Sequence, residues 1–153
     1  MEPSRLLSQS AGEVMVAYGV FYLQESEGPD VATLEGGDDT PGLVIAAGDG
    51  GLQLRSAGND HYPAVRLELW SGAPPRDAGP WEAASDDGLT VRETGRVVVM
   101  SPFGEESDAA LTLPVPGRYH VRVHAQGQQQ ARDLGEATFA HGIEQWLLQV
   151  WAE

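Results

Sequence analysis

The sequence predicts an all-β fold, an antiparallel β-sandwich of roughly eight strands connected by long polar loops. Short segments alternate apolar and polar residues with the period of two that a half-buried strand has. The chain of 153 residues also contains 19 glycines and 10 prolines. Both residue types are unfavourable inside helices and strands and collect in turns, so their number indicates many short elements rather than a few long helices.

The first third of the chain predicts a loose lead-in over residues 1–12, followed by a single domain over residues 13–153. The run VMVAYGVFYL, residues 14–23, is rich in β-branched and aromatic types and predicts one long strand. Residues 25–42 are polar and acidic and predict a loop, which at this length is either mobile or functional. The segments LVIAA and LQLRS surround the glycine-rich residues 48–51, which predicts a hairpin.

Further strands are expected between the later Pro/Gly loops. Val65, Leu67 and Leu69 alternate with other residue types and are expected on one face of a strand. Weaker strand candidates are residues 89–91, 96–100 and 111–115. Two segments fit a short helix as an alternative: residues 128–134, within a polar connection, and residues 144–148, for which the β-branched and aromatic terminus favours a strand.

The last two predicted strands have distinct inward and outward sets. Tyr119, Val121 and Val123 are expected to face inward, and they alternate with a cationic outer set, Arg118, His120, Arg122 and His124. In the terminal strand, residues 143–151, the expected inward set is Trp146, Leu148 and Val150. Trp70 and Trp151 fall on the opposite phase of their strands, which predicts that each is exposed or covered by a second core.

Charge restricts the classes of partner. The chain has 23 acidic residues against 9 basic ones, for a formal net charge of −14. Nucleic acids and anionic membranes are bound by clustered Lys and Arg, so neither is an expected partner. A basic protein partner, a bound cation and solubility alone are all compatible with this charge. The absence of cysteine, of an apolar leader and of a long apolar segment indicates a cytoplasmic protein.

The sequence contains no recognisable catalytic, cofactor or metal motif and therefore predicts a protein that is not an enzyme. No serine occupies a Gly-x-Ser-x-Gly elbow. His120 and His124 are four residues apart, which on a strand separates them by ~13 Å, too far for one ion. The carboxylates at residues 38–39 and 105–108 lack the spacing of a calcium loop. No metal and no cofactor is expected.

An acidic interval supplies the candidate binding residues. Between Arg5 and Arg55 the chain contains no Lys and no Arg. An uncompensated negative field accelerates association with a basic partner. A solvated loop is the alternative interpretation of the same interval. The predicted partner-binding residues are Glu25, Glu27, Asp30, Glu35, Asp38 and Asp39, with Trp70 as an aromatic anchor.

The order of segments resembles the competence protein J family, small bacterial proteins that inhibit a DNA-entry nuclease. The stretches that carry the resemblance are VAYGVFYLQE, GGLQLRSAGNDHYPAVRLELW, GRVVVMS, LTLPVPGRYHVRVHA and the apolar terminal strand. The chain departs from the family in its acidic loop and in the long connection after residue 125. The resemblance implies a β-sandwich that docks on a nuclease or a related toxin and blocks it.

The sequence is therefore compatible with three functions. The first is an inhibitor or immunity-type protein that occludes the active site of a basic partner, such as a nuclease or a toxin. The second is a β-sandwich module that binds carbohydrate or calcium, with tryptophans as platforms for sugar rings. The third is an accessory subunit that forms homo-oligomers through a sheet edge. The sequence leaves the oligomeric state open.

Overall fold

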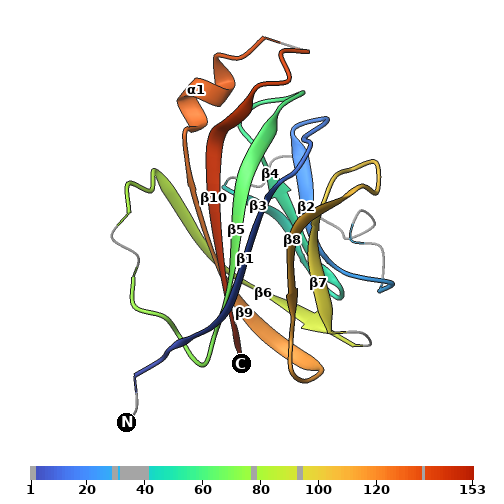
Figure 1. Cartoon of the computed structure of the whole chain (residues 1–153), viewed down its shortest axis with the longest axis vertical. Helices are drawn as coiled ribbons and strands as arrows, with labels where there is room; N and C mark the ends of the chain where they lie inside the picture. The colour runs from blue at the N-terminus through green and yellow to red at the C-terminus, as the bar shows by residue number, and fades with distance from the viewer. Residues whose placement is uncertain (1–2, 29–30, 32–41, 77–78, 93–94, 136) are drawn as a thin grey trace.

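The computed structural model describes residues 3–28, 31, 42–76, 79–92, 95–135 and 137–153. Within these residues the chain forms ten strands and one short helix (Figure 1). The elements are β1 (Leu6–Glu13), β2 (Val20–Glu25), β3 (Val44–Gly48), β4 (Gly51–Arg55), β5 (Tyr62–Trp70), β6 (Ala83–Val91), β7 (Arg96–Met100), β8 (Glu106–Thr112), β9 (Gly117–Gln126), α1 (Gln128–Arg132) and β10 (His141–Ala152).

Two sheets pack face to face, which confirms the predicted all-β sandwich. The first sheet has the strand order β1-β5-β10-β9-β6 and the second has the order β3-β4-β2-β7-β8. Neighbouring strands are antiparallel, except that β5 and β10 run parallel. Two of the weaker candidates differ in extent: β6 begins at Ala83, well before residue 89, and β8 ends at Thr112 instead of covering residues 111–115.

The core lies between the two sheets and follows from the alternation. The buried side chains of the first sheet include Leu67, Val121, Val123, Trp146 and Leu148, and those of the second include Phe21, Leu23, Leu52 and Leu54. The two layers interlock where the Phe21 ring meets the Trp146 indole edge to face, with centroids 4.9 Å apart. Each large apolar side chain buried here contributes ~1.5–3 kcal/mol to folding.

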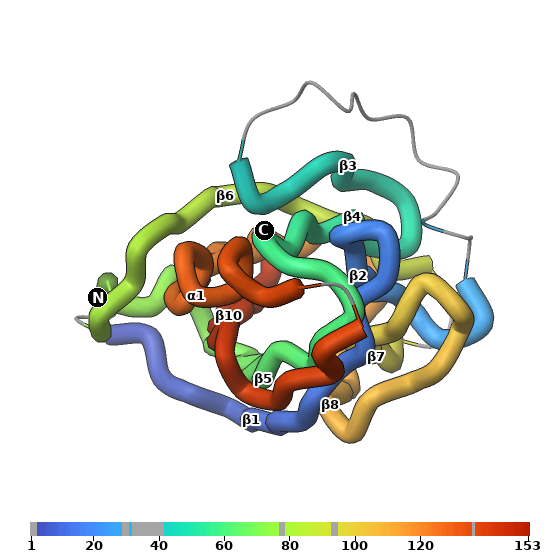
Figure 2. The backbone as a smooth tube through the Cα atoms, turned by 90° about the horizontal axis from the view of Figure 1, so that it is seen from above, coloured from blue at the N-terminus to red at the C-terminus, as the bar shows by residue number. Residues whose placement is uncertain are grey.

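The edges of the two sheets meet on both sides of the sandwich (Figure 2). β1 lies beside β8, where the Ser10 hydroxyl donates to the Asp108 carbonyl (3.0 Å) and accepts from the Ala110 N–H (3.1 Å). A Cβ on Gly12 would lie 2.9 Å from the Ala109 nitrogen, so glycine permits this approach. On the other side, the Gly50 N–H donates to the carbonyl of Thr90 in β6 (2.9 Å). These contacts leave less exposed backbone for pairing with a second chain.

The N-terminal region differs most from the prediction. The single strand expected over residues 14–23 is wrong, because a tight turn interrupts it: the Val20 N–H donates to the Ala17 carbonyl (3.2 Å), with φ +57° at Tyr18 and +73° at Gly19. The chain passes here from the first sheet to the second. The lead-in expected over residues 1–12 is replaced from Leu6 onward by β1. Most of β1 is exposed, so it lacks the alternation that would have marked it as a strand.

The helix considered for residues 128–134 is present as the shorter α1, which begins after Gly127 in a left-handed conformation (φ +81°). Only Ala131 of this helix is buried. Among the residues that the structure describes, no helix is both long and apolar enough to cross a membrane.

The two chain ends lie at the same end of the sandwich. Leu6 at the start of β1 and Trp151 near the end of β10 are both paired with Trp70 of β5. Figure 1 shows both termini at the lower end, and the β1–β2 and β7–β8 turns at the upper end.

Candidate functional site

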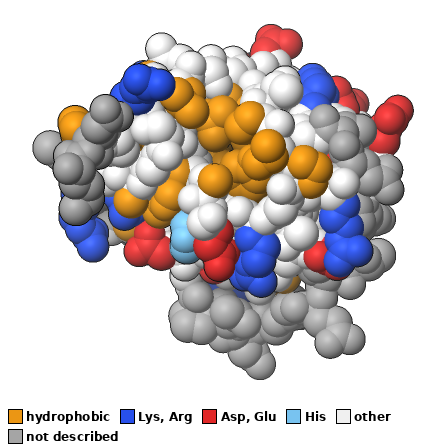
Figure 3. Space-filling model, turned by 90° about the horizontal axis from the view of Figure 1, so that it is seen from below, with side chains coloured by type: hydrophobic (Ala, Val, Ile, Leu, Met, Phe, Trp, Pro, Cys, Tyr) orange, Lys and Arg blue, Asp and Glu red, His pale blue; other side chains and the backbone are white. Residues whose placement is uncertain are grey.

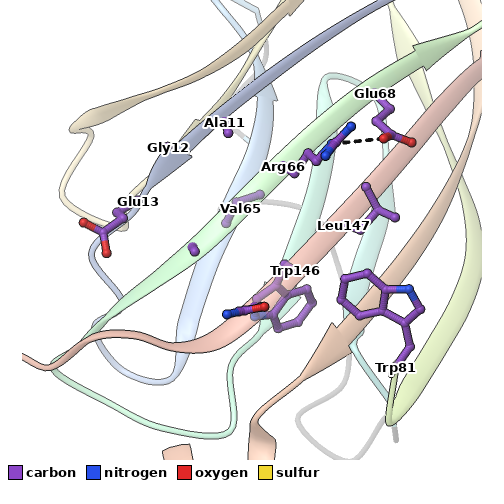
Figure 4. A pocket seen from close by; sticks show the side chains of 11 residues that line it. Ala11, Gly12, Glu13, Val65, Arg66, Glu68, Trp81, Trp146 and Leu147 are labelled. Atoms are coloured by element: carbon purple, nitrogen blue, oxygen red, sulfur yellow. Dashed lines mark ion pairs between the residues drawn. The ribbon is translucent and has the colours of Figure 1, made fainter. Parts of the chain in front are cut away.

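A groove of about 610 Å³ lies on the outer face of the first sheet, over β1, β5 and β10. Its apolar floor includes Ala11, Ala64 and Leu147, and its polar side chains are Glu13, Arg66, Glu68 and Gln145. Trp81, from the connection between β5 and β6, forms one wall beside Leu147 (Figure 4). The volume is in the range of pockets that hold small ligands.

The wall of the groove is held by contacts with β9. The Trp81 indole lies against the imidazole of His124, with centroids 5.4 Å apart. The Arg122 guanidinium donates to the carbonyl of Pro74 in the same connection (3.1 Å). His124 is consequently only 5% exposed, and the prediction that it belongs to an exposed cationic face is wrong. His120 and Arg118 of that set are exposed.

Most of the hydrogen-bonding capacity of Glu68 is already used. Its carboxylate accepts from the Trp70 indole N–H (2.9 Å) and from the Gln149 amide (3.0 Å), and it pairs with the Arg66 guanidinium (3.0 Å). Figure 4 shows this ion pair between two side chains of β5. Arg66 remains about half exposed, with its side chain also donating to Gln9. Arg66 can therefore still donate to a ligand in the groove, whereas Glu68 mainly fixes the floor.

At the other end of the groove, the Glu13 carboxylate contacts the Nδ1 atom of His141 (3.1 Å). Both side chains are largely exposed. The His141 ring stacks on the ring of Tyr62, with centroids 4.6 Å apart. Glu13 is thus a positioned carboxylate at the mouth of the groove.

The structure places the predicted partner-binding residues in different environments. Glu25 is fully buried, and its carboxylate accepts from the backbone N–H groups of Arg92 (3.0 Å) and Gly95 (3.1 Å). It holds the β6–β7 turn and is not available to a partner in this structure. Glu27 is exposed in the turn that follows β2. Trp70 is half-buried, with its indole N–H bonded to Glu68. Asp30, Glu35, Asp38 and Asp39 lie outside the described residues.

A second polar cluster is buried at the upper end of the sandwich. The Glu144 carboxylate accepts from the Ser56 hydroxyl (2.7 Å), the Ala57 N–H (2.8 Å) and the Trp146 indole N–H (2.8 Å). The Ser56 oxygen also lies 2.8 Å from the Nε2 atom of His61. Burial lowers the pKa of His61, and the charge of Glu144 partly offsets this effect.

This cluster contains serine, histidine and a carboxylate, but their order differs from that of a hydrolytic triad. In a triad the carboxylate orients the imidazole through its second nitrogen. Here the carboxylate contacts the serine, and the His61 Nδ1 atom has no hydrogen-bond partner among the described residues. Ser56 is 6% exposed. The arrangement fits a structural clamp between β10 and the β4–β5 connection.

Sequence reasoning missed both the groove and this clamp. Trp81 directly follows a Pro/Gly loop, which was the one available signal of a fixed aromatic wall. Ser56 and Glu144 are 88 residues apart, so no local spacing could indicate their contact. Among the described residues, no group of three His, Asp or Glu side chains is placed to hold a metal ion.

Comparison with known proteins identifies the fold. No family model matches the sequence, and no curated protein matches it. A solved structure of ComJ from Bacillus subtilis, described as an inhibitor of the DNA-degrading activity of NucA, is similar with a TM-score of 0.66 and 12% identity, covering 99% of this chain and 100% of that chain. A structure described as crocagin biosynthetic gene J has a TM-score of 0.61 and 19% identity, covering 96% and 99% of the two chains. The resemblance based on strand order is confirmed at the level of the fold.

Proposed function

We propose that this protein is a non-catalytic inhibitor of the immunity type, which docks on a basic protein such as a nuclease or a toxin and occludes its active site. The observation that carries the proposal is the likeness to the NucA inhibitor ComJ, which extends over 99% of this chain. The likeness gives the two proteins a common fold of the same extent, although at 12% identity their surface side chains differ.

Charge supports the same proposal. A nuclease presents a cationic groove to the phosphates of DNA. A protein with a formal net charge of −14 can compete for such a groove without resembling DNA in detail. The field also steers the encounter, so its main effect is on the association rate.

The proposed steering residues are the predicted partner-binding carboxylates other than the buried Glu25. They are Glu27, Asp30, Glu35, Asp38 and Asp39. In the proposal they attract the partner and contribute little to the fold. Glu27 is exposed, as this role requires.

The direct test titrates this protein into a DNA-degradation assay. The enzymes assayed are purified NucA and the nucleases or toxins that are encoded near the gene in its source organism. Inhibition that saturates at one equivalent is expected for at least one of these enzymes. Amidation of the five steering residues should slow association at low salt. A matched control amidates five other carboxylates, Glu82, Asp86, Asp87, Asp133 and Glu153. Equal association rates for the two variants would show that the five residues do not steer the partner and serve only solubility.

The groove supports carbohydrate binding as a second candidate function. Trp81 offers an indole face beside polar side chains, Arg66 and Gln145, the combination that binds the face and the hydroxyl edge of a sugar ring. Calorimetry with a panel of soluble oligosaccharides tests this function. Binding that is lost in Trp81→Ala but kept in Trp151→Ala would favour the sugar module over the inhibitor.

A further inference from the structure

Three exposed aromatic side chains lie on loops at the upper end of the sandwich. They are Tyr18 in the β1–β2 turn (81% exposed), Phe103 in the β7–β8 turn (58%) and Phe139 in the α1–β10 connection (46%). We call these three residues the aromatic end. Monomeric surfaces rarely gather large aromatic side chains without a partner, and interfaces are enriched in them.

Tyr18 and Phe139 are not the residue types that their backbone conformations favour. Tyr18 has φ +57° and Phe139 has φ +52°, a left-handed conformation that favours Gly, Asn and Asp. The β1–β2 turn has Gly at its second central position, where glycine is expected, but Tyr at the first, where Asn would fit better. Strain of this kind at an exposed position is typical of functional sites.

The loops that carry the rings are fixed. In the β7–β8 turn, the Ser101 hydroxyl oxygen accepts from the N–H groups of Phe103 (3.2 Å) and Glu105 (3.1 Å). The Phe103 ring meets the Tyr18 ring edge to face, with centroids 6.4 Å apart. Such rigid aromatic anchors lose little conformational entropy on binding.

Hydrogen bonds also link Tyr18 and Phe139 through one loop. Asn59 accepts from the N–H of Gly19 (3.3 Å), next to Tyr18. The adjacent Asp60 accepts from the Ala137 N–H through its side chain (2.9 Å) and from the Phe139 N–H through its carbonyl (2.8 Å). The three rings therefore belong to one connected set of loops.

The charge beside the rings defines the partner. Glu105 and Glu106 follow Phe103 almost directly and are exposed, as is Asp108 further along β8. Arg96 pairs with Glu106 (3.4 Å), which leaves this strip net negative. We infer that the aromatic end is the surface that docks on a basic protein, with the rings in an apolar pocket and the carboxylates against its Lys and Arg rim. This inference rests on the proposed function and names the contact surface for it.

The lower end is the alternative docking face. Figure 3 shows hydrophobic side chains gathered near the centre of that face. The exposed large residues there are aliphatic: Leu6 and Leu7 at the start of β1, and Val115 in the β8–β9 turn. None of the three has a positive φ. Val115 is 56% exposed, nearly as much as Phe103, and so supplies a matched control.

The experiment places the photo-crosslinking residue p-benzoylphenylalanine at position 18, and at position 115 as the control. Each protein is irradiated in an extract of the source organism, alone or with an excess of a competitor that lacks the photo-crosslinking residue. The competitor is either the wild-type protein or the double variant Tyr18→Asn/Phe103→Ser. The captured protein is identified by mass spectrometry, purified and titrated against the wild type, the double variant Tyr18→Asn/Phe103→Ser, and Val115→Ser. Asn suits the left-handed turn, so thermal unfolding should show that the double variant remains folded.

The expected result is an adduct at position 18 that wild-type competitor abolishes and the double variant does not. The captured protein should be basic, and the double variant should bind it at least tenfold more weakly, mainly through faster dissociation. Val115→Ser should change the affinity less than twofold. Absence of a competed adduct at position 18, or equal affinity of the double variant, overturns the inference.

The same data separate the inference from the proposed function. A basic partner that is neither a nuclease nor a toxin, but depends on Tyr18 and Phe103, supports the aromatic end and refutes the inhibitor. A nuclease that is captured through position 115, and binds the double variant normally, supports the inhibitor and refutes the aromatic end.

Discussion

Two connections at opposite ends of the sandwich are each held by a buried glutamate, with different chemistry. At the lower end, Glu25 accepts from the backbone N–H groups of Arg92 and Gly95 and holds the β6–β7 turn. At the upper end, Glu144 accepts from the Ala57 N–H and from two side chains, those of Ser56 and Trp146.

The difference lies in what else each carboxylate reaches. Ser56 also contacts His61, so the upper network is coupled to a histidine whose pKa burial lowers from its ordinary value. The two backbone bonds of Glu25 involve no such group. Both networks should stabilise the fold, and His61 should make the stability that the upper network provides depend on pH below about 6.5.

The largest expected effect is that of Glu144→Ala. The substitution removes the acceptor of three donors, of which the Ser56 hydroxyl and the Trp146 indole N–H are buried and the Ala57 N–H is part-buried. Each unsatisfied group costs about 1–3 kcal/mol, so we expect a loss of about 3–5 kcal/mol in the free energy of unfolding. Urea denaturation measures it. Glu153→Ala, which breaks an exposed ion pair with Arg118, is the control and should cost less than about 1 kcal/mol. Similar losses of unfolding free energy in both variants would contradict the structural role assigned to Glu144.

Glu25→Ala should have the next largest effect. Two backbone donors lose their acceptor, one buried and one part-buried, so we expect a loss of about 2–3 kcal/mol. Glu27→Ala removes a neighbouring exposed carboxylate and should change stability by less than about 0.5 kcal/mol. If the two variants unfold at the same urea concentration, the structural role assigned to Glu25 is wrong.

The pH dependence of stability should report on His61 in the upper network. The pKa of His61 is lowered in the folded state, so below the unfolded value of about 6.5 the unfolded chain binds a proton more readily. Stability should therefore fall as the pH decreases from about 6.5 toward the folded pKa. His61→Gln should flatten this slope, whereas His120→Gln, at an exposed position, should not. Urea midpoints between pH 5 and 8 provide the measurement. Identical slopes for the wild type and His61→Gln would show that His61 does not make stability depend on pH.

The smallest expected effect concerns the strain at the upper end. Tyr18→Asn should leave stability unchanged or raise it by about 0.5–1 kcal/mol, because Asn tolerates the left-handed conformation. Tyr18→Val should lower stability, since a β-branched residue is least suited to positive φ. Thermal unfolding distinguishes these outcomes. Destabilisation by Asn would show that the tyrosine ring itself supports the turn.

Alternation predicted the strands that bury one face. β4, β5, β9 and β10 were found where the period of two placed them, with Trp146, Leu148 and Val150 inward. The same signal failed for β1, which is exposed along most of its length. It also failed at the β1–β2 turn, where the apolar run continues through the turn because both flanking segments are buried and Gly19 is the only local sign of a break.

The local sequence pattern could not predict which polar groups are buried. Glu25 looks like the first member of an acidic run, yet its burial depends on Gly95, 70 residues away. The groove likewise depends on the β5–β6 connection folding back over β9, which brings Trp81 to His124. Such contacts follow from the packing of two sheets, and the sequence spacing does not encode them.

The position of the chain ends has a practical consequence for handling the protein. β1 and β10 flank β5, and Leu6 and Trp151 meet at the same residue, Trp70. A biotin, a fluorophore or a fused carrier joined to either terminus is therefore attached at the lower end, away from the aromatic end. Immobilisation on a sensor through one terminus orients every molecule with Tyr18 and Phe103 toward the solution. Immobilisation through the other terminus gives the same orientation, so the choice of tag does not mask this surface.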